Sequence, residues 1–113
     1  MDDAARKFKI WDFSPSHDRL LLRSPKDAAH KSNVDIAFFG VEYLELPTAL
    51  DGLSIGEPTE HECRRVSEMT GSAPPKNRIL VLESGGRRHL IVAVAYKVSE
   101  NDLDIFTSSL SRI

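Results

Sequence analysis

The amino-acid sequence predicts an α+β fold: a mostly antiparallel, twisted sheet of five to seven strands built from hairpins. Two short connections support this prediction, because the turns at residues 14–17 and 85–86 are too short for parallel crossovers. An amphipathic pattern at residues 60–70 adds one helix that packs on the sheet. A partly open barrel is the alternative arrangement of the strands.

Residues 78–98 give the strongest hairpin signal in the chain. Two apolar runs flank Gly85 and Gly86, which accept the positive φ angles of a tight turn without a steric penalty. A turn at these glycines places Glu83 opposite Arg88 and leaves apolar residues on both faces of the strands. We therefore expect this hairpin to lie centrally and to be covered on both sides.

Residues 7–24 predict a first hairpin around turn-forming residues at 14–17. A four-residue loop would place Asp12 opposite Arg19, an ion pair that a cross-strand register favours. Residues 1–6 are polar and we expect them to be disordered.

A third strand is predicted at residues 34–46. Gly40 interrupts it, so this stretch is either one bent strand or two strands. Pro47 ends the pattern, and residues 50–55 are expected to form a short edge strand.

The helix at residues 60–70 has clear boundaries in the sequence. Thr59 and Glu62 form a capping box, and Gly71 stands where a helix commonly ends. Its narrow apolar stripe, with Cys63 as a core thiol, should face the sheet, and residues 72–77 should connect the helix to the next hairpin.

After residue 98 the sequence leaves two structures open. Leu103, Phe106, Leu110 and Ile113 recur at spacings of three and four residues, which favours a short C-terminal helix. The β-branched and aromatic residues in the same segment would also suit a strand.

Length and composition indicate a single globular domain over residues 1–113. The chain is 41% hydrophobic and 28% charged, as in ordinary globular proteins, and its net charge of −2 argues against nucleic-acid binding. Cys63 is the one cysteine, so no internal disulfide points to an oxidising compartment. The N-terminus does not resemble a signal peptide, and no apolar stretch is long enough to cross a membrane. We expect a cytoplasmic protein.

No motif predicts catalysis, a metal site or a cofactor. His61 and Cys63 are too close along a helix to grip one ion, because such neighbours point in different directions. Ser16, His17 and Asp18 include hydrolase residue types, but consecutive residues in a turn do not form a catalytic triad. We therefore predict no metal, no cofactor and no enzymatic activity.

Exposed charges supply the first candidate binding residues. Arg87 and Arg88 follow the glycine turn and should face solvent, where they could contact an anion or an acidic partner. If so, reversing both charges should leave the fold intact.

Acidic residues and one aromatic residue complete the candidate set. Strand alternation places Asp35, Glu42 and Glu45 at exposed positions, where Glu42 and Glu45 could join a partner-binding patch. Trp11 points away from Phe8 on the first hairpin, so either a helix or a partner should cover it.

The predicted function is a non-enzymatic protein-interaction module that binds a protein partner or a second copy of itself, with no nucleic acid and no membrane involved. In general character, small and slightly acidic, the chain resembles the immunity factors and adaptors of bacteria, a likeness that covers no motif and assigns no residue. One alternative is a small-molecule-binding barrel or cryptic enzyme with a pocket near Trp11, Tyr96 and His89. Another is a structural homodimer joined through sheet edges.

Overall fold

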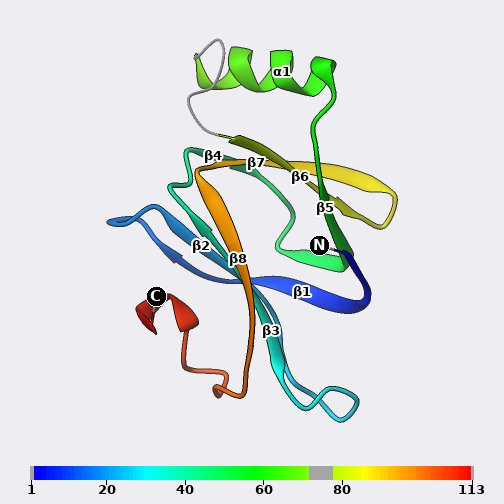
Figure 1. Cartoon of the computed structure of the whole chain (residues 1–113), viewed down its shortest axis with the longest axis vertical. Helices are drawn as coiled ribbons and strands as arrows, with labels where there is room; N and C mark the ends of the chain where they lie inside the picture. Colours follow the sequence, from blue (N-terminus) through cyan, green and yellow to red (C-terminus); the bar gives the residue numbers. More distant parts are fainter. Residues whose placement is uncertain (1, 72–77, 113) are drawn as a thin grey trace.

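A computed structural model of the chain describes residues 2–71 and 78–112. It consists of an antiparallel sheet of eight strands and one α-helix, which fits the predicted α+β class (Figure 1). The strands are β1 (Asp2–Ser14), β2 (Arg19–Ser24), β3 (Asn33–Phe39), β4 (Tyr43–Glu45), β5 (Ala49–Gly56), β6 (Arg78–Ser84), β7 (Arg87–Ala93) and β8 (Ala95–Asn101). Their hydrogen-bonded order is β4-β7-β6-β5-β1-β2-β3-β8. The predicted connector at 72–77 and Ile113 lie outside the described residues.

The sheet has more strands than the predicted five to seven because two long stretches of chain are each divided by a bend. β3 continues into β4 across Gly40, and β7 continues into β8 across Val94. The pairing persists through the bends, since Val94 N donates to Phe39 O and Glu42 N to Val92 O, both at 2.8 Å. Gly40 has φ +63°, and a Cβ there would lie 2.6 Å from Cγ2 of Val94. The division at Gly40 was one of the two predicted outcomes; the bend at Val94 was not predicted.

These bends curl the sheet around one main apolar core. Its buried residues come from six strands and the β3–β4 bend: Phe8, Leu20, Leu22, Val34, Ile36, Phe38, Val41, Leu50, Leu53, Leu80, Leu82, Ile91 and Ala93. Two smaller clusters lie on the outer surface of the sheet, one under the helix and one under the C-terminal segment.

The β6–β7 hairpin has the predicted register. Glu83 pairs with Arg88, and Gly85 and Gly86 form the turn with φ of 58° and 75°. Both faces of β6 and β7 are buried, because Leu80 faces the main core while Val81 faces the cluster under the helix. The prediction that both faces are covered is therefore confirmed for these two strands, but the predicted central position is wrong, because they lie beside the short edge strand β4 at one end of the strand order.

The helix α1 (Glu60–Thr70) has the predicted boundaries and the predicted capping box. Gly71 ends it in the left-handed conformation at φ 72°. Val66 is fully buried against β6 and β7, and Cys63 packs beside it, partly buried. Figure 1 shows α1 lying across this side of the sheet.

The first hairpin forms, but its predicted register is wrong. Arg19 pairs with Ser14 instead of Asp12 because β1 extends to Ser14 and Asp18 takes a left-handed conformation (φ 50°) in the turn. A bulge at Trp11 shifts the pairing between Ile10 and Asp12. The bulge turns Trp11 toward the outer surface of the sheet.

Two expectations about strand ends also differ from the structure. β5 is not an edge strand, because it pairs with β1 on one side and with β6 on the other. Residues 2–6, which we expected to be disordered, belong to β1, where Asp3 pairs with Leu53 of β5.

The C-terminal segment is neither a helix from residue 99 nor a further strand. β8 extends to Asn101 through its pairing with β3, and only a short 3-10 helix (Ser109–Arg112) follows. Between them Asp104 accepts bonds from Phe106 N and Thr107 Oγ1, both at 2.9 Å, which hold a turn instead of a helix.

Candidate functional site

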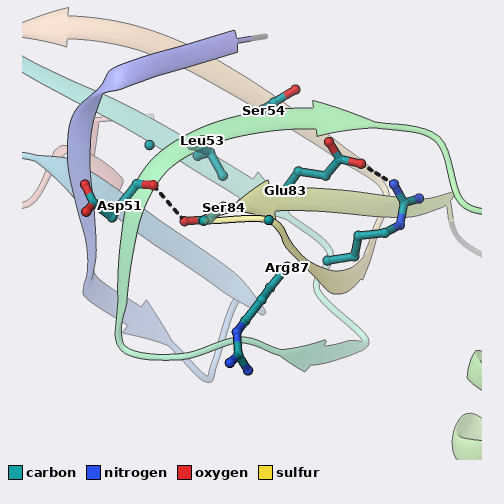
Figure 2. Close-up of a pocket in the computed structure, with 10 residues that line it drawn as sticks. Asp51, Leu53, Ser54, Glu83, Ser84 and Arg87 are labelled. Carbon is teal, nitrogen blue, oxygen red and sulfur yellow. Dashed lines mark hydrogen bonds and ion pairs between the residues drawn. The ribbon is translucent and has the colours of Figure 1, made fainter.

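A cavity of about 350 Å³ opens between β5 and the turn that joins β6 to β7 (Figure 2). β5 pairs with β6 only over Ser54–Gly56, while its earlier residues follow β1, so the two strands diverge. Ser84 Oγ donates to Asp51 O at 3.2 Å across the gap. The walls are formed by Asp51, Gly52, Leu53, Ser54, Glu83, Ser84, Gly85, Gly86, Arg87 and Arg88.

Arg88 ties the turn to the start of α1. Its guanidinium donates two bonds to Glu62, at 3.0 and 2.9 Å, one to Glu83, and one to Glu57 O at 3.2 Å. These bonds from Arg88, with those at Thr59, outweigh burial and lower the pKa of Glu62 to about 2. The pKa of Arg88 is raised, first by its bonds to Glu62. Arg88 is therefore a structural residue of this site.

Arg87 differs from its neighbour. It is exposed, and within the described residues no hydrogen bond or ion pair engages its guanidinium. Figure 2 shows its side chain extending away from Glu83. The expected tolerance of charge reversal fits Arg87 only, since Arg88→Glu would bring a carboxylate against Glu62 and Glu83.

The predicted acidic residues do not gather at this cavity. Glu45 binds Arg65 through two bonds of 2.6 and 2.8 Å and accepts a third from the Tyr43 hydroxyl at 2.7 Å. The bonds from Arg65 are the main reason that the pKa of Glu45 is lowered. Glu42 is exposed at the β3–β4 bend. Glu45 thus holds α1 to β4.

The aromatic residues suggested for a pocket lie on opposite surfaces of the sheet. Trp11 packs in the outer cluster with Leu21 and Leu110, while Tyr96 packs against the main core, 6.0 Å from the Phe38 ring. His89 pairs with Leu82 near the β6–β7 turn. The C-terminal segment of the chain itself helps to cover Trp11.

The sequence prediction that Asp35 is exposed is wrong. Its carboxylate is 1% exposed and binds Arg23, also 1% exposed, through bonds of 2.7 and 2.9 Å. Asn101 donates a third bond, at 2.8 Å, to the same carboxylate. Burial alone would raise the pKa of Asp35, but the bonds from Arg23 and Asn101 lower it below its usual value. A charged residue inside an apolar run on each of two neighbouring strands was the sequence signal for this pair.

Among residues 2–71 and 78–112, no group of three His, Cys, Asp or Glu side chains could hold a metal ion. The described part of the chain contains no helix with the length and apolarity needed to span a membrane. Comparison with protein-family models, with curated proteins and with solved structures finds no match for this chain. The geometry of the molecule is therefore the basis of any functional proposal.

Proposed function

We propose that this protein is a non-enzymatic interaction module that binds a single acidic side chain of a protein partner at Arg87 and the cavity beside it. The observation that carries the proposal is the guanidinium of Arg87, which stands exposed at a preformed cavity with no partner among the described residues. Arg23, Arg65 and Arg88 each bind a carboxylate within the chain.

The polar groups of the site suit one carboxylate side chain. A guanidinium pairs with a carboxylate through two parallel hydrogen bonds, and the adjoining Ser54 can add a hydroxyl. Asp51 and Glu83 in the same walls repel a dense polyanion, so an isolated Asp or Glu of a partner fits better than nucleic acid.

The turn that presents Arg87 is already ordered. Arg88 joins it to Glu62 of α1 and to Glu83 of β6, so little conformational freedom remains to be lost on binding. We place the proposed activity in the cytoplasm, which the free thiol of Cys63 supports.

A homodimer is the second candidate function. β8 lies at one end of the sheet order and is seven residues long, and Val98 on it is 41% exposed. Such an edge can pair with the same strand of a second copy. A dimer by light scattering that Val98→Lys dissolves would favour this candidate; a monomeric protein would exclude it.

Co-purification from cells of the source organism tests the proposed function. Tagged wild type, Arg87→Glu and Arg64→Glu would be compared, because Arg64 is an exposed arginine on α1 that does not line the cavity. We expect wild type and Arg64→Glu to retain one stoichiometric protein, and Arg87→Glu to lose it. The partner should in turn lose binding when an acidic residue at its contact is neutralised.

Two results would contradict the proposal. One is equal recovery of the partner with Arg87→Glu and wild type. The other is recovery of no stoichiometric protein by any folded form of the chain, each form being checked by circular dichroism.

A further inference from the structure

A second cavity, of about 340 Å³, lies between β1 and the loop that joins β2 to β3. β1 contributes Lys7 and Lys9, which pair in regular register with β5, and Phe8 between them is fully buried. Both lysines are exposed and therefore stand on the outer face of the strand, with their Cα atoms about 7 Å apart. The lining consists of Lys7, Lys9, Ser24, Pro25, Asp27 and His30.

The loop in this lining is held in shape by its own hydrogen bonds. Lys26 N donates to Asn33 Oδ1 and Asp27 N to His30 O, both at 2.8 Å. The Asp27 carboxylate accepts from Ala29 N and His30 N, both at 2.8 Å, and from Nδ1 of His30 at 3.0 Å. This last bond leaves Nε2 as the ring nitrogen of His30 that can meet a ligand. The cavity is therefore formed before anything binds.

The lining carries more positive than negative charge. Asp27 is its one carboxylate among the described residues, and the bonds within the loop, first that from Ala29 N, lower the pKa of Asp27. Neither Lys7 nor Lys9 forms an ion pair with a described group. Asp51 lies opposite Lys7 on β5, but it lines the first cavity instead. The two ammonium groups are therefore available to an anion.

A buried arginine adds to this positive charge. Arg6 is only 9% exposed, and its guanidinium donates to Ser24 Oγ at 3.0 Å, to Ser24 O at 3.4 Å and to Ser32 O at 2.7 Å. All three acceptors are neutral, whereas the other buried arginine, Arg23, binds a carboxylate. A buried cation without a counter-charge destabilises a fold. Because Ser24 also lines the cavity, the charge of Arg6 lies directly behind that wall, where an anion in the cavity would compensate it.

We propose that this cavity binds a small phosphomonoester. Its phosphate group would lie between the ammonium groups of Lys7 and Lys9, with His30 beside it. Lysine binds phosphate as a point charge, and a phosphomonoester offers three acceptor oxygens and close to two negative charges at pH 7. The volume is at the lower end of the range for ligand pockets, so the organic part of the ligand is small.

The balance of charge favours a dianion over a carboxylate. Arg6, Lys7 and Lys9 carry three positive charges against the one negative charge of Asp27, an excess of two when His30 is neutral. The cavity beside Arg87 differs, because one free guanidinium there faces two acidic side chains. The two cavities share no lining residue, so this proposal does not depend on the one made for Arg87.

Nuclear magnetic resonance titration of the full ¹⁵N-labelled chain tests the proposal, with methyl phosphate as the probe at pH 7 and constant ionic strength. We expect saturable binding with a dissociation constant of about 1 mM, and shifts that concentrate on the amides of residues 7–9 and 24–30. Dimethyl phosphate, which is similar in shape but carries a single negative charge, should bind about tenfold more weakly.

Variants of the two lysines locate the site. Lys7→Met and Lys9→Met should each weaken the binding of methyl phosphate about fivefold, and the double variant should abolish saturation below about 20 mM. Lys97→Met is the matched control, because it removes the same charge from an exposed lysine of β8 that does not line the cavity, and it should bind as wild type does. The spectrum of each variant shows whether it is folded.

Three results would overturn the proposal. The first is no saturable shift in wild type with methyl phosphate at about 20 mM. The second is wild-type affinity in the folded double variant, or a loss of affinity in Lys97→Met as large as that in Lys7→Met. The third is equal affinity for dimethyl phosphate, which would show that the site does not select a dianion.

Discussion

The outer surface of the sheet is covered in two places, and the two covers differ in chemistry. Over β6 and β7, α1 buries an apolar cluster that includes Val66, and its ion pairs lie around the rim. Over β2 and β3, the C-terminal segment covers a small apolar cluster and, beside it, the Arg23–Asp35 pair, which is almost wholly buried.

The difference follows from how each cover satisfies its own backbone. A helix pairs its peptide groups internally, so it can present an apolar stripe to the sheet. An irregular segment carries carbonyl groups that need donors, and here Asp104 O accepts from Arg23 while Leu103 O accepts from Asn33. The sheet surface under this segment therefore carries polar groups beside its small apolar cluster.

The largest effect on the free energy of unfolding is expected from a substitution under the C-terminal segment, which is the polar cover. Asp35→Leu leaves Arg23 buried without its counter-charge and should lower the free energy of unfolding by about 3–5 kcal/mol. The double variant Arg23→Met/Asp35→Leu should recover most of that loss. Urea denaturation of the single and double variants measures both effects, and a double variant as unstable as the single one would contradict this account.

The next largest effect on the free energy of unfolding is expected from a substitution in α1, which is the apolar cover. Val66→Ala opens a cavity under α1 and should lower the free energy of unfolding by about 2 kcal/mol. Met69→Ala, at a position 63% exposed on the same helix, is the control and should change it by less than about 0.5 kcal/mol. Similar losses from both variants in urea denaturation would mean that α1 does not pack as described.

A smaller effect concerns acid stability at the rim. The pKa of Glu62 is about 2 in the folded protein against an ordinary value of 4.5, so its ion pair with Arg88 stabilises the fold fully above pH 4.5. This contribution is lost as the pH falls from 4.5 toward 2. Because the pair is partly exposed, we expect about 1 kcal/mol.

Glu62→Gln separates the ion pair from the helix cap. Glutamine can keep the capping-box bond, but it has no charge to lose, so the variant should be less stable at pH 7 and should show a flatter pH dependence between 4.5 and 2. Thermal unfolding at several pH values measures this. An unchanged slope in the variant would mean that Glu62 does not carry the effect.

The smallest effect is expected at the other rim pair. Arg65→Met removes the ion pair with Glu45, whose two side chains are 40% and 31% exposed. The free energy of unfolding should fall by about 0.5 kcal/mol, and added salt should shrink the difference between variant and wild type. A loss as large as that of Asp35→Leu would remove the contrast between the two covers.

The sequence was informative where structure depends on neighbouring residues. The Gly85-Gly86 turn fixed the register of β6 and β7, and the Thr59–Glu62 capping box marked the start of α1. Both signals are complete within a few residues, so no distant part of the chain is needed to interpret them.

The predictions from the sequence were wrong where residues far apart in the chain determine the structure. The alternation of side chains along β3 predicted that Asp35 is exposed to solvent. Its bonds with Arg23 of the neighbouring strand β2 and with Asn101 of β8 instead hold it in the interior. The bulge at Trp11 and the position of β5 between β1 and β6 likewise depend on pairing partners far along the chain.

For the same reason, only part of the candidate site could be predicted from the sequence. The turn placed both Arg87 and Arg88 at the surface, but only the packing of α1 beside the turn distinguishes them. Arg88 meets Glu62 of that helix, while Arg87 stays unpaired among the described residues.

The measurement that tests the central proposal most directly is site-specific photo-crosslinking in cells. A photoreactive residue at position 54, in the wall of the cavity beside Arg87, would report what occupies that cavity. We predict one adduct with a single protein, attached next to an acidic residue, and its loss when Arg87→Glu is added. An adduct that persists with Arg87→Glu, or no adduct at all with the folded chain, would contradict the account.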